Sequence, residues 1–245
     1  MKYRIPLYRP SISKKEILRV NDCLKSTWIS SKGKYINNFE KLFSKYTRIK
    51  YSTVVVNGTA ALHLALLALN IKNGDEVIVP TFTYVASVNA IKYVNAKPVF
   101  IDSNLNDWQL SIKEIEKKIT KRTKAIICPH IYGQMTNMTE LVKIKKKHKL
   151  FLIEDCAEAL GSFFKSKHAG KYGDISTFSF YGSKTITTGE GGMICSDNKS
   201  LISKAIKFKL QVISDKKLSY WHDVVGYNYK MTNVCAAIGL SQLEV

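Results

Sequence analysis

Three segments of the sequence carry side chains or backbone groups that could do chemistry. The first, residues 57–61 (Asn-Gly-Thr-Ala-Ala), follows an apolar run at 54–56 and opens a helical pattern. A helix N-terminus preceded by glycine presents free N–H groups and the positive end of the helix dipole, which suits a phosphate group. A strand–glycine–helix turn is also a structural necessity in many α/β proteins, so this motif alone is weak evidence for phosphate binding.

The other two segments place charged residues after apolar runs. Asp155 ends the run Phe-Leu-Ile-Glu-Asp at 151–155, and Lys184 follows the run at 175–180. A carboxylate at a strand end could be a metal ligand, a ribose binder, a helix cap for residues 157–160 or the partner of a protonated ring nitrogen. Most lysines lie on the surface, so Lys184 by itself indicates no function.

The hydrophobic pattern predicts elements that would bring these segments together. Short runs rich in Val and Ile predict buried strands, and helical stretches alternate with them. The predicted strands are 53–56, 76–79, 98–101, 125–128 and 151–153, and the predicted helices are 59–69, 84–94, 111–119 and 138–148. This alternation predicts an α/β fold with a doubly wound, mostly parallel sheet, which binds ligands at the carboxyl ends of its strands.

The two ends of the chain show other patterns. A helix capped by residues 11–13 places Ile17, Leu18 and Leu24 on one side, and a second helix is predicted around 36–46. After residue 160 the pattern predicts strands at 175–180 and 192–195, joined by a Gly-rich turn, and helices near 199–209 and from 232 onward.

Composition limits the classes of protein. The chain has 245 residues, of which 45% are hydrophobic and 23% charged, as in ordinary globular enzymes. No apolar run reaches the roughly 18 residues of a membrane span, and the first residues lack the apolar core of a signal peptide, so we expect a cytoplasmic protein without a membrane partner. Five dispersed cysteines without CxxC spacing predict reduced, mostly buried thiols and no metal site.

The net charge of +19, from 38 basic and 19 acidic residues, is unusual. Basic stretches such as 143–149 are a feature of proteins that bind nucleic acid. Their lysines follow amphipathic helix patterns without interleaved aromatic residues, which favours a solvated face, so no nucleic acid is expected. A basic surface would also attract an anionic sugar nucleotide.

Taken in order, the motifs resemble those of a known family. Gly58-Thr59, Asp155, Ser179, Lys184 and residues 189–192 (Gly-Glu-Gly-Gly) follow one another as in fold-type I pyridoxal-phosphate enzymes. The chain is similar to the DegT/DnrJ/StrS family of sugar aminotransferases from residue 10 to residue 244. Segments 28–33, 57–63, 80–87, 154–159, 177–184 and 226–232 carry the resemblance.

The resemblance implies a role for each residue near the cofactor ring. Lys184 would form a Schiff base with pyridoxal 5'-phosphate and move protons between the substrate carbon and the cofactor. Asp155 would stay ionised against the protonated pyridine nitrogen. Tyr84 would stack on the pyridine ring of the cofactor. The alternative is that its side chain packs in the hydrophobic core.

The resemblance also implies how the phosphate is held and how subunits share the site. The cofactor-binding residues include Gly58, and the phosphate would be bound by the backbone N–H groups of Thr59 and Ala60 and the hydroxyls of Thr59 and Ser179. Asn228 matches a residue that reaches the neighbouring subunit's cofactor, so a homodimer with shared active sites is implied.

Two further residues are harder to interpret. Relatives often carry Gln or His in place of Glu158, near the phenolic oxygen of the cofactor. A carboxylate there must be protonated or turned away, because two adjacent anions repel. His130, in the sequence His-Ile-Tyr-Gly at 130–133, lies at another strand end, and we interpret it as a structural rather than a catalytic histidine.

The implied function is a two-stage transamination from glutamate to a nucleotide-linked 4-keto-6-deoxy sugar. Residues 28–33 and 220–223 are most similar to family members that aminate C4 of GDP-4-keto-6-deoxymannose. One alternative is a sugar 3-dehydratase, although dehydratase relatives have histidine in place of Lys184. A truncated, inactive or regulatory cofactor-binding homologue is another.

The resemblance finally implies a domain organisation. Residues 1–245 would form the cofactor-binding large domain with an N-terminal segment, and the small C-terminal domain expected after residue 245 is absent. For residues 1–245 alone we expect weak cofactor retention and low turnover, because that domain usually helps to close the active site.

Overall fold

A seven-stranded sheet runs through the centre of the chain in the computed structural model, which describes residues 5–6, 8–211, 222 and 224–244. The strands lie in the order β1-β9-β8-β5-β4-β2-β3. Their bounds are β1 (Tyr51–Val55), β2 (Glu76–Pro80), β3 (Lys97–Ile101), β4 (Thr123–Pro129), β5 (Phe151–Asp155), β8 (Ile175–Ser179) and β9 (Gly192–Ser196). Two short strands, β6 (Phe163–Phe164) and β7 (Lys167–His168), form a separate hairpin.

The sheet is mostly parallel. Neighbouring strands from β8 to β3 pair in parallel, whereas β9 pairs antiparallel with both β8 and β1, so β9 alone runs against the other six described strands of this sheet. The prediction of a doubly wound, mostly parallel α/β fold is therefore confirmed. Each predicted strand is present, with ends that differ by a few residues.

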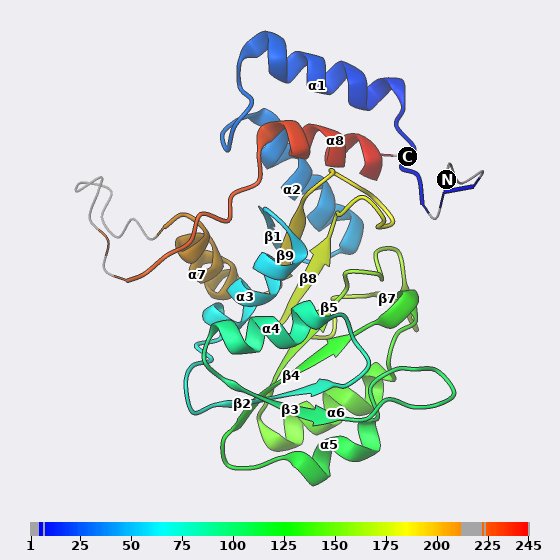
Figure 1. Ribbon diagram of the computed structural model, residues 1–245, viewed down its shortest axis with the longest axis vertical. Helices are drawn as coiled ribbons and strands as arrows, with labels where there is room; N and C mark the ends of the chain where they lie inside the picture. Colours follow the sequence, from blue (N-terminus) through cyan, green and yellow to red (C-terminus); the bar gives the residue numbers. More distant parts are fainter. Residues whose placement is uncertain (1–4, 7, 212–221, 223, 245) are drawn as a thin grey trace.

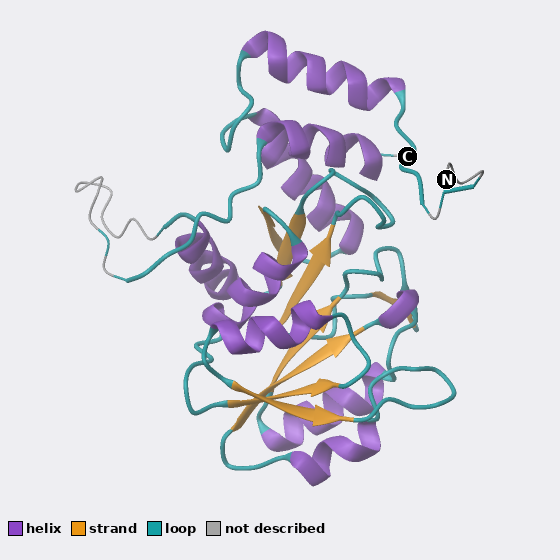
Figure 2. Cartoon of the chain, viewed as in Figure 1, coloured by secondary structure: helices purple, strands orange, loops and turns teal. Residues whose placement is uncertain are grey.

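Helices cover both faces of the sheet (Figure 2). Their bounds are α1 (Lys14–Ser26), α2 (Lys34–Thr47), α3 (Gly58–Ala68), α4 (Val85–Tyr93), α5 (Ile112–Lys118), α6 (Met138–His148), α7 (Lys199–Lys209) and α8 (Asn233–Leu243), with a single turn η1 (Ile131–Gly133). Figure 1 shows α3 and α4 on one side of the sheet and α5 and α6 on the other. A core of aliphatic side chains fills the α3–α4–α7 side, where α3 is buried almost all round.

An aromatic core lies on the other face, between α2, α8 and strands β8 and β9. Phe43 of α2 contacts the rings of Phe178 and Phe180 at centroid distances of 5.0 and 5.6 Å. Helix α8 approaches this core through Gly239, where an added Cβ would lie 2.6 Å from the ring of Phe39. The glycine thus permits the close contact between α2 and α8.

Helix α1 is capped as predicted, and its apolar residues are exposed. Ser13 caps it and exchanges hydrogen bonds with Glu16, as the local sequence predicts. Ile17, Leu18 and Leu24, which the pattern places on one side of the helix, are 54%, 68% and 57% exposed. The helix instead contacts α8 through polar groups, because the Arg19 guanidinium donates to Ser241 Oγ and to the Glu244 carboxylate.

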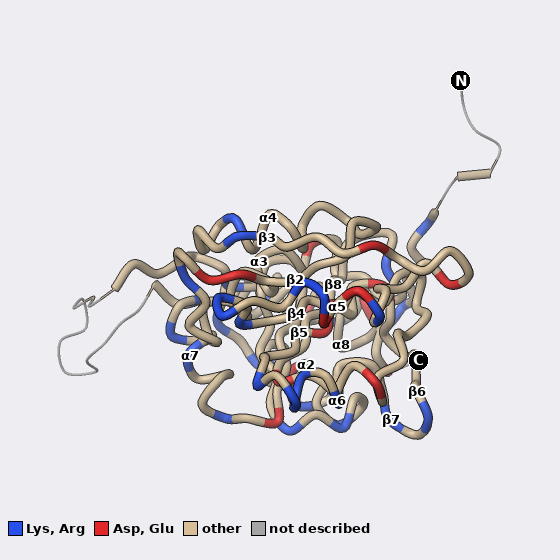
Figure 3. Tube along the Cα trace, turned by 90° about the horizontal axis from the view of Figure 1, so that it is seen from below, with Lys and Arg blue, Asp and Glu red and all other residues tan. Residues whose placement is uncertain are grey.

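The basic stretch at 143–149 lies on α6 and just after it. Lysine and arginine positions are spread over several elements of the described chain rather than gathered on one (Figure 3). On α6, Lys145 pairs with Asp174 at 2.6 Å and Lys147 pairs with Glu116 at 2.8 Å. Among the described residues, no helix is long and apolar enough to cross a membrane.

The aromatic core generates a stability prediction. Phe43 is completely buried, so we expect Phe43→Ala to lower the free energy of unfolding by about 3–5 kcal/mol, through lost burial and the cavity left behind. Urea unfolding followed by circular dichroism measures this change. Phe163→Ala is the matched control, because Phe163 is 59% exposed. Equal losses in the two variants would contradict this account of the core.

Candidate active site

A cavity of about 360 Å³ opens at the carboxyl edge of the sheet. It lies where β1 leads into α3, where β2 leads toward α4, and where β4, β5 and β8 end. Seven of the predicted site residues line it: Gly58, Thr59, Tyr84, Asp155, Glu158, Ser179 and Lys184. Ala60 and Asn228 do not line it. The sheet thus brings together residues that are far apart in the sequence.

The N-terminus of α3 forms one wall of the cavity. Asn57 caps the helix, and its Oδ1 accepts the N–H of Ala60 at 2.9 Å. A Cβ added to Gly58 would lie 2.9 Å from the Cβ of Ser179, so glycine allows this helix end to approach the end of β8. The N–H of Ala60 is available to a ligand only if Asn57 turns away, and its predicted role in phosphate binding stays a prediction.

Asp155 lies at the base of the cavity and is 8% exposed. Its Oδ2 accepts the hydroxyl of Ser87 at 2.8 Å, and its Oδ1 accepts the N–H of Ala157 at 3.1 Å. Both donors are neutral, and no described cation lies within ion-pair distance. Burial raises the pKa of the Asp155 carboxyl, while these hydrogen bonds and the positive charges of His130 and Lys184 act in the opposite direction. The site therefore contains a buried carboxylate that lacks a direct countercharge.

Lys184 reaches the cavity from the loop after β8. Its Nζ is 3.4 Å from Glu158 Oε1, and the side chain is 22% exposed. The other oxygen of Glu158 accepts the backbone N–H of Tyr132 at 2.8 Å. Glu158 is thus turned toward one backbone donor and one cation, which is the reorientation that a carboxylate near an anionic oxygen would need.

Two of the predicted residues, Tyr84 and Asn228, are exposed to solvent. Tyr84 stands at the start of α4 with its side chain against the cavity, and the residue is 77% exposed, so its ring is not packed in the core. Asn228 is exposed and forms an isolated bridge with Leu210 beyond α7. The related segment 220–223 falls largely outside the described residues.

Several residues that shape the site were missed by sequence reasoning. Ser87 supports Asp155 from α4, and Tyr132 supports Glu158 through its backbone. Gln109 is 1% exposed and ties the loop before α5 to the 130–133 segment, donating to the carbonyl of Ile131 and accepting its N–H. A buried glutamine next to a left-handed turn carries no pattern that would reveal these contacts.

Comparison with known proteins identifies the family of this chain. The family model of the DegT/DnrJ/EryC1/StrS aminotransferases matches residues 10–245. The chain belongs to this family. A GDP-perosamine synthase from Escherichia coli O157:H7 is 59% identical over 244 residues, which are 100% of this chain and 66% of the relative. This chain therefore spans slightly less than two thirds of that relative's length.

Solved structures of similar proteins share the fold of this chain. The aminotransferase from Psychrobacter cryohalolentis matches with a TM-score of 0.91 at 33% identity, over 97% of this chain and 63% of that one. A GDP-4-keto-6-deoxymannose-3-dehydratase with a trapped PLP–glutamate geminal diamine matches with a TM-score of 0.92 at 28% identity, over 98% of this chain and 67% of that one. Both transamination and dehydration thus occur on this family fold.

The buried carboxylate generates a prediction about pH. Since burial raises the pKa of Asp155 above its ordinary 3.8, the stability it contributes is fully present below that value and is lost as the pH rises through its pKa in the folded protein. An asparagine side chain does not titrate, so we expect Asp155→Asn to gain stability relative to the wild type between about pH 4 and about pH 7. Urea unfolding at both pH values measures the difference.

The exposed Asp102 provides the control for this effect. Its carboxylate accepts the N–H of Ser103, a bond that an asparagine oxygen can also accept. Asp102→Asn therefore removes an exposed carboxylate instead of a buried one, and its stability is measured at the same two pH values. A constant stability difference between Asp155→Asn and the wild type would show that Asp155 is not perturbed by burial.

Proposed function

We propose that this chain binds pyridoxal 5'-phosphate in the cavity and transfers an amino group from glutamate to GDP-4-keto-6-deoxymannose, giving GDP-perosamine. The observation that carries the proposal is the meeting of Lys184, Asp155 and the N-terminus of α3 in one cavity. These groups offer a nucleophilic amine, a buried anion and a phosphate site.

The residues present fit the cofactor. Asp155 has neutral donors but no direct countercharge, which suits the protonated ring nitrogen of a pyridine. The α3 N-terminus and Ser179 approach each other closely because Gly58 has no side chain, which brings backbone N–H groups and a hydroxyl together as donors for a phosphate. Lys184 lies across the cavity with its side chain largely buried. The proposed ligands are therefore Gly58, Thr59, Ala60, Tyr84, Asp155, Glu158, Ser179 and Lys184.

When bound, pyridoxal phosphate supplies the electron sink that lets an amino group pass between two carbon atoms. The chain supplies the positioning and the proton transfers. Asp155 would hold the protonated ring nitrogen through its negative charge, and Ser87 fixes the direction of the carboxylate. Lys184 Nζ is the base and acid that moves a proton at the substrate carbon. Glu158, held by Tyr132, orients Lys184 between these steps.

The choice of substrate rests on the relatives. The E. coli protein at 59% identity is named for GDP-perosamine, and the match includes the whole of this chain. A structural relative is a GDP-4-keto-6-deoxymannose-3-dehydratase. The family resemblance implies that dehydratases have histidine at the position of Lys184. The lysine favours transamination over dehydration.

We also propose a homodimer with shared active sites in the cytoplasm. Asn228 is exposed and does not line the cavity of its own chain, as expected of a residue that serves a neighbouring subunit. All five cysteines are free thiols, and four of them are buried, which suits a reducing compartment.

The function is tested by the spectrum of the cofactor. We expect the protein mixed with pyridoxal phosphate to acquire the visible absorbance of a lysine-bound cofactor, and glutamate to replace it with the spectrum of the pyridoxamine form. Lys184→Ala should abolish the covalent attachment and slow the glutamate half-reaction on the order of a thousandfold, because the lysine is both nucleophile and proton carrier.

The matched control is Lys171→Ala, since Lys171 is also partly exposed but pairs with Asp197 at 2.6 Å, and it does not line the cavity. This variant should behave as the wild type does. A cofactor that binds but does not respond to glutamate would rule out the transaminase. Formation of GDP-perosamine from GDP-4-keto-6-deoxymannose, measured by mass spectrometry, decides the sugar.

A further inference from the structure

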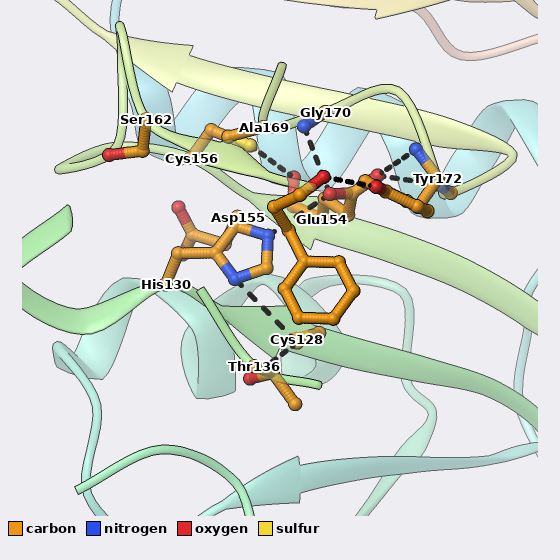
Figure 4. A network of polar contacts seen from close by, with 12 residues as sticks. Cys128, His130, Thr136, Glu154, Asp155, Cys156, Ser162, Ala169, Gly170 and Tyr172 are labelled. Atoms are coloured by element: carbon orange, nitrogen blue, oxygen red, sulfur yellow. Dashed lines mark hydrogen bonds and ion pairs between the residues drawn. The ribbon is translucent and has the colours of Figure 1, made fainter. Parts of the chain in front are cut away.

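A buried polar cluster that contains His130 and Glu154 adjoins Asp155 (Figure 4). His130 follows β4, and Glu154 precedes Asp155 in β5. The His130 Nε2 is 3.0 Å from Glu154 Oε2, and both side chains are 0% exposed. The proposed mechanism uses neither side chain.

The Glu154 carboxylate is fully occupied by donors. Oε2 accepts the N–H of Gly170 at 2.9 Å in addition to His130, and Oε1 accepts the N–H groups of Tyr172 at 2.7 Å and Gly173 at 2.5 Å. Burial raises the pKa of the Glu154 carboxyl, but the contact with His130 and the N–H groups of Gly173 and Gly170 lower it below its ordinary value. Three backbone donors thus favour an ionised Glu154, to which Nε2 of His130 donates a hydrogen.

The second nitrogen of His130 indicates the charge of the ring. Its Nδ1 lies 4.0 Å from Cys128 Sγ, and that thiol donates to Thr136 Oγ1 at 3.3 Å. A hydrogen on Nδ1 would face this sulfur, so the surroundings accommodate a protonated ring. Burial lowers the pKa of His130, but Cys128 and Glu154 raise it further, to about 10.

A metal ion is the alternative occupant of this cluster. Ligand atoms of His130, Glu154 and Cys156 lie within 4.8 Å of one another, the kind of set that binds a cation. Here both Glu154 oxygens are already taken by N–H groups, and Nε2 of His130 faces one of them. A cation bound between His130 and Oε2 would have to displace the contact between them and compete with the N–H of Gly170, so an ion pair fits the geometry better.

The cluster acts on Asp155 from close by. The backbone N–H of His130 donates to the carbonyl of Asp155 at 3.0 Å, and both residues line the cavity. Two cations favour the ionised form of Asp155, namely His130 and Lys184. Lys184 takes part in the chemistry, whereas His130 does not, so His130 is the constant positive charge beside the carboxylate.

We propose that His130 and Glu154 form a fixed ion pair that positions Asp155 and favours its anionic form, which makes His130 a positioning residue of the active site. Glu154 anchors the pair to the 170–173 turn, and His130 connects it to the end of β4. The titratable groups near His130 are Cys128, Glu154, Asp155 and Cys156. The role of Asp155 toward a ring nitrogen rests on the function proposed above.

The charge of His130 can be measured without the cofactor. In the cofactor-free protein, the Cε1–H proton and carbon signals of the five histidines can be assigned by substituting them one at a time. We expect the His130 signal to stay at the imidazolium position from about pH 6 to about pH 8.5, a range over which an ordinary histidine loses its charge. A neutral signal, or a titration near the ordinary value, would overturn the ion pair.

The effect on the site is measured with His130→Gln, whose amide can still donate to Glu154 but has no charge. We expect its dissociation constant for pyridoxal phosphate to rise about tenfold, which corresponds to about one pKa unit of lost support for the Asp155 anion. The pH at which the visible absorbance of the bound cofactor is half changed should also differ from that of the wild type. His148→Gln is the control, because His148 pairs with Glu116 at 2.7 Å outside the cavity.

Two outcomes separate this proposal from the proposed function. A His130→Gln protein that folds and binds the cofactor with wild-type affinity and midpoint would overturn the positioning role. Failure of the wild-type protein to bind pyridoxal phosphate would refute the proposed function instead, and the histidine signals would then decide the ion pair alone. If His130→Gln does not fold, the other four substitutions still assign the wild-type His130 signal.

Discussion

The carboxylate of Asp155 is buried at the end of the central strand, and the carboxyl edge of the sheet is arranged around it. Burial of an anion is costly unless hydrogen bonds and charges compensate for the lost water. Ser87 comes from α4, Ala157 from the turn after β5, and the neighbouring strands bring His130 and Lys184. None of these groups forms a direct ion pair with Asp155, so the carboxylate keeps its capacity to bind a cation in the cavity.

Strand geometry explains how one strand end serves two purposes. Consecutive side chains of a strand point to opposite faces, so Glu154 and Asp155 leave β5 in opposite directions. Asp155 meets α4 on one face, and Glu154 meets the 170–173 turn on the other. His130 stands at the end of the adjacent strand β4, whose Pro129 is in register with Asp155. The His130–Glu154 pair therefore connects the 170–173 turn on one face of the sheet with Asp155 on the other.

Local and periodic features were predictable because their causes lie within a few residues. Buried parallel strands require continuous apolar runs, and the caps of α1 and α8 use Ser13 and Thr232 directly before the helix. The exposure of the apolar residues of α1 was not predictable, because apolar residues on one side of a helix do not show whether another element packs against them. Ser87 was missed because its contact with Asp155 spans 68 residues. Such contacts depend on how the strands are ordered, which the hydrophobic pattern does not encode.

The turn at Tyr132 shows why a carboxylate is tolerated beside Lys184. Tyr132 has a left-handed φ of 54°, which is unfavourable for a residue with a side chain, and Gln109 holds the preceding residue in place. This conformation directs the Tyr132 N–H at Glu158, and Glu158 then faces Lys184 with its other oxygen. A glutamate held in this way need not direct its charge at an anionic oxygen of a ligand. The strained turn thus resolves the repulsion that a freely rotating glutamate would cause in a site that already contains Asp155.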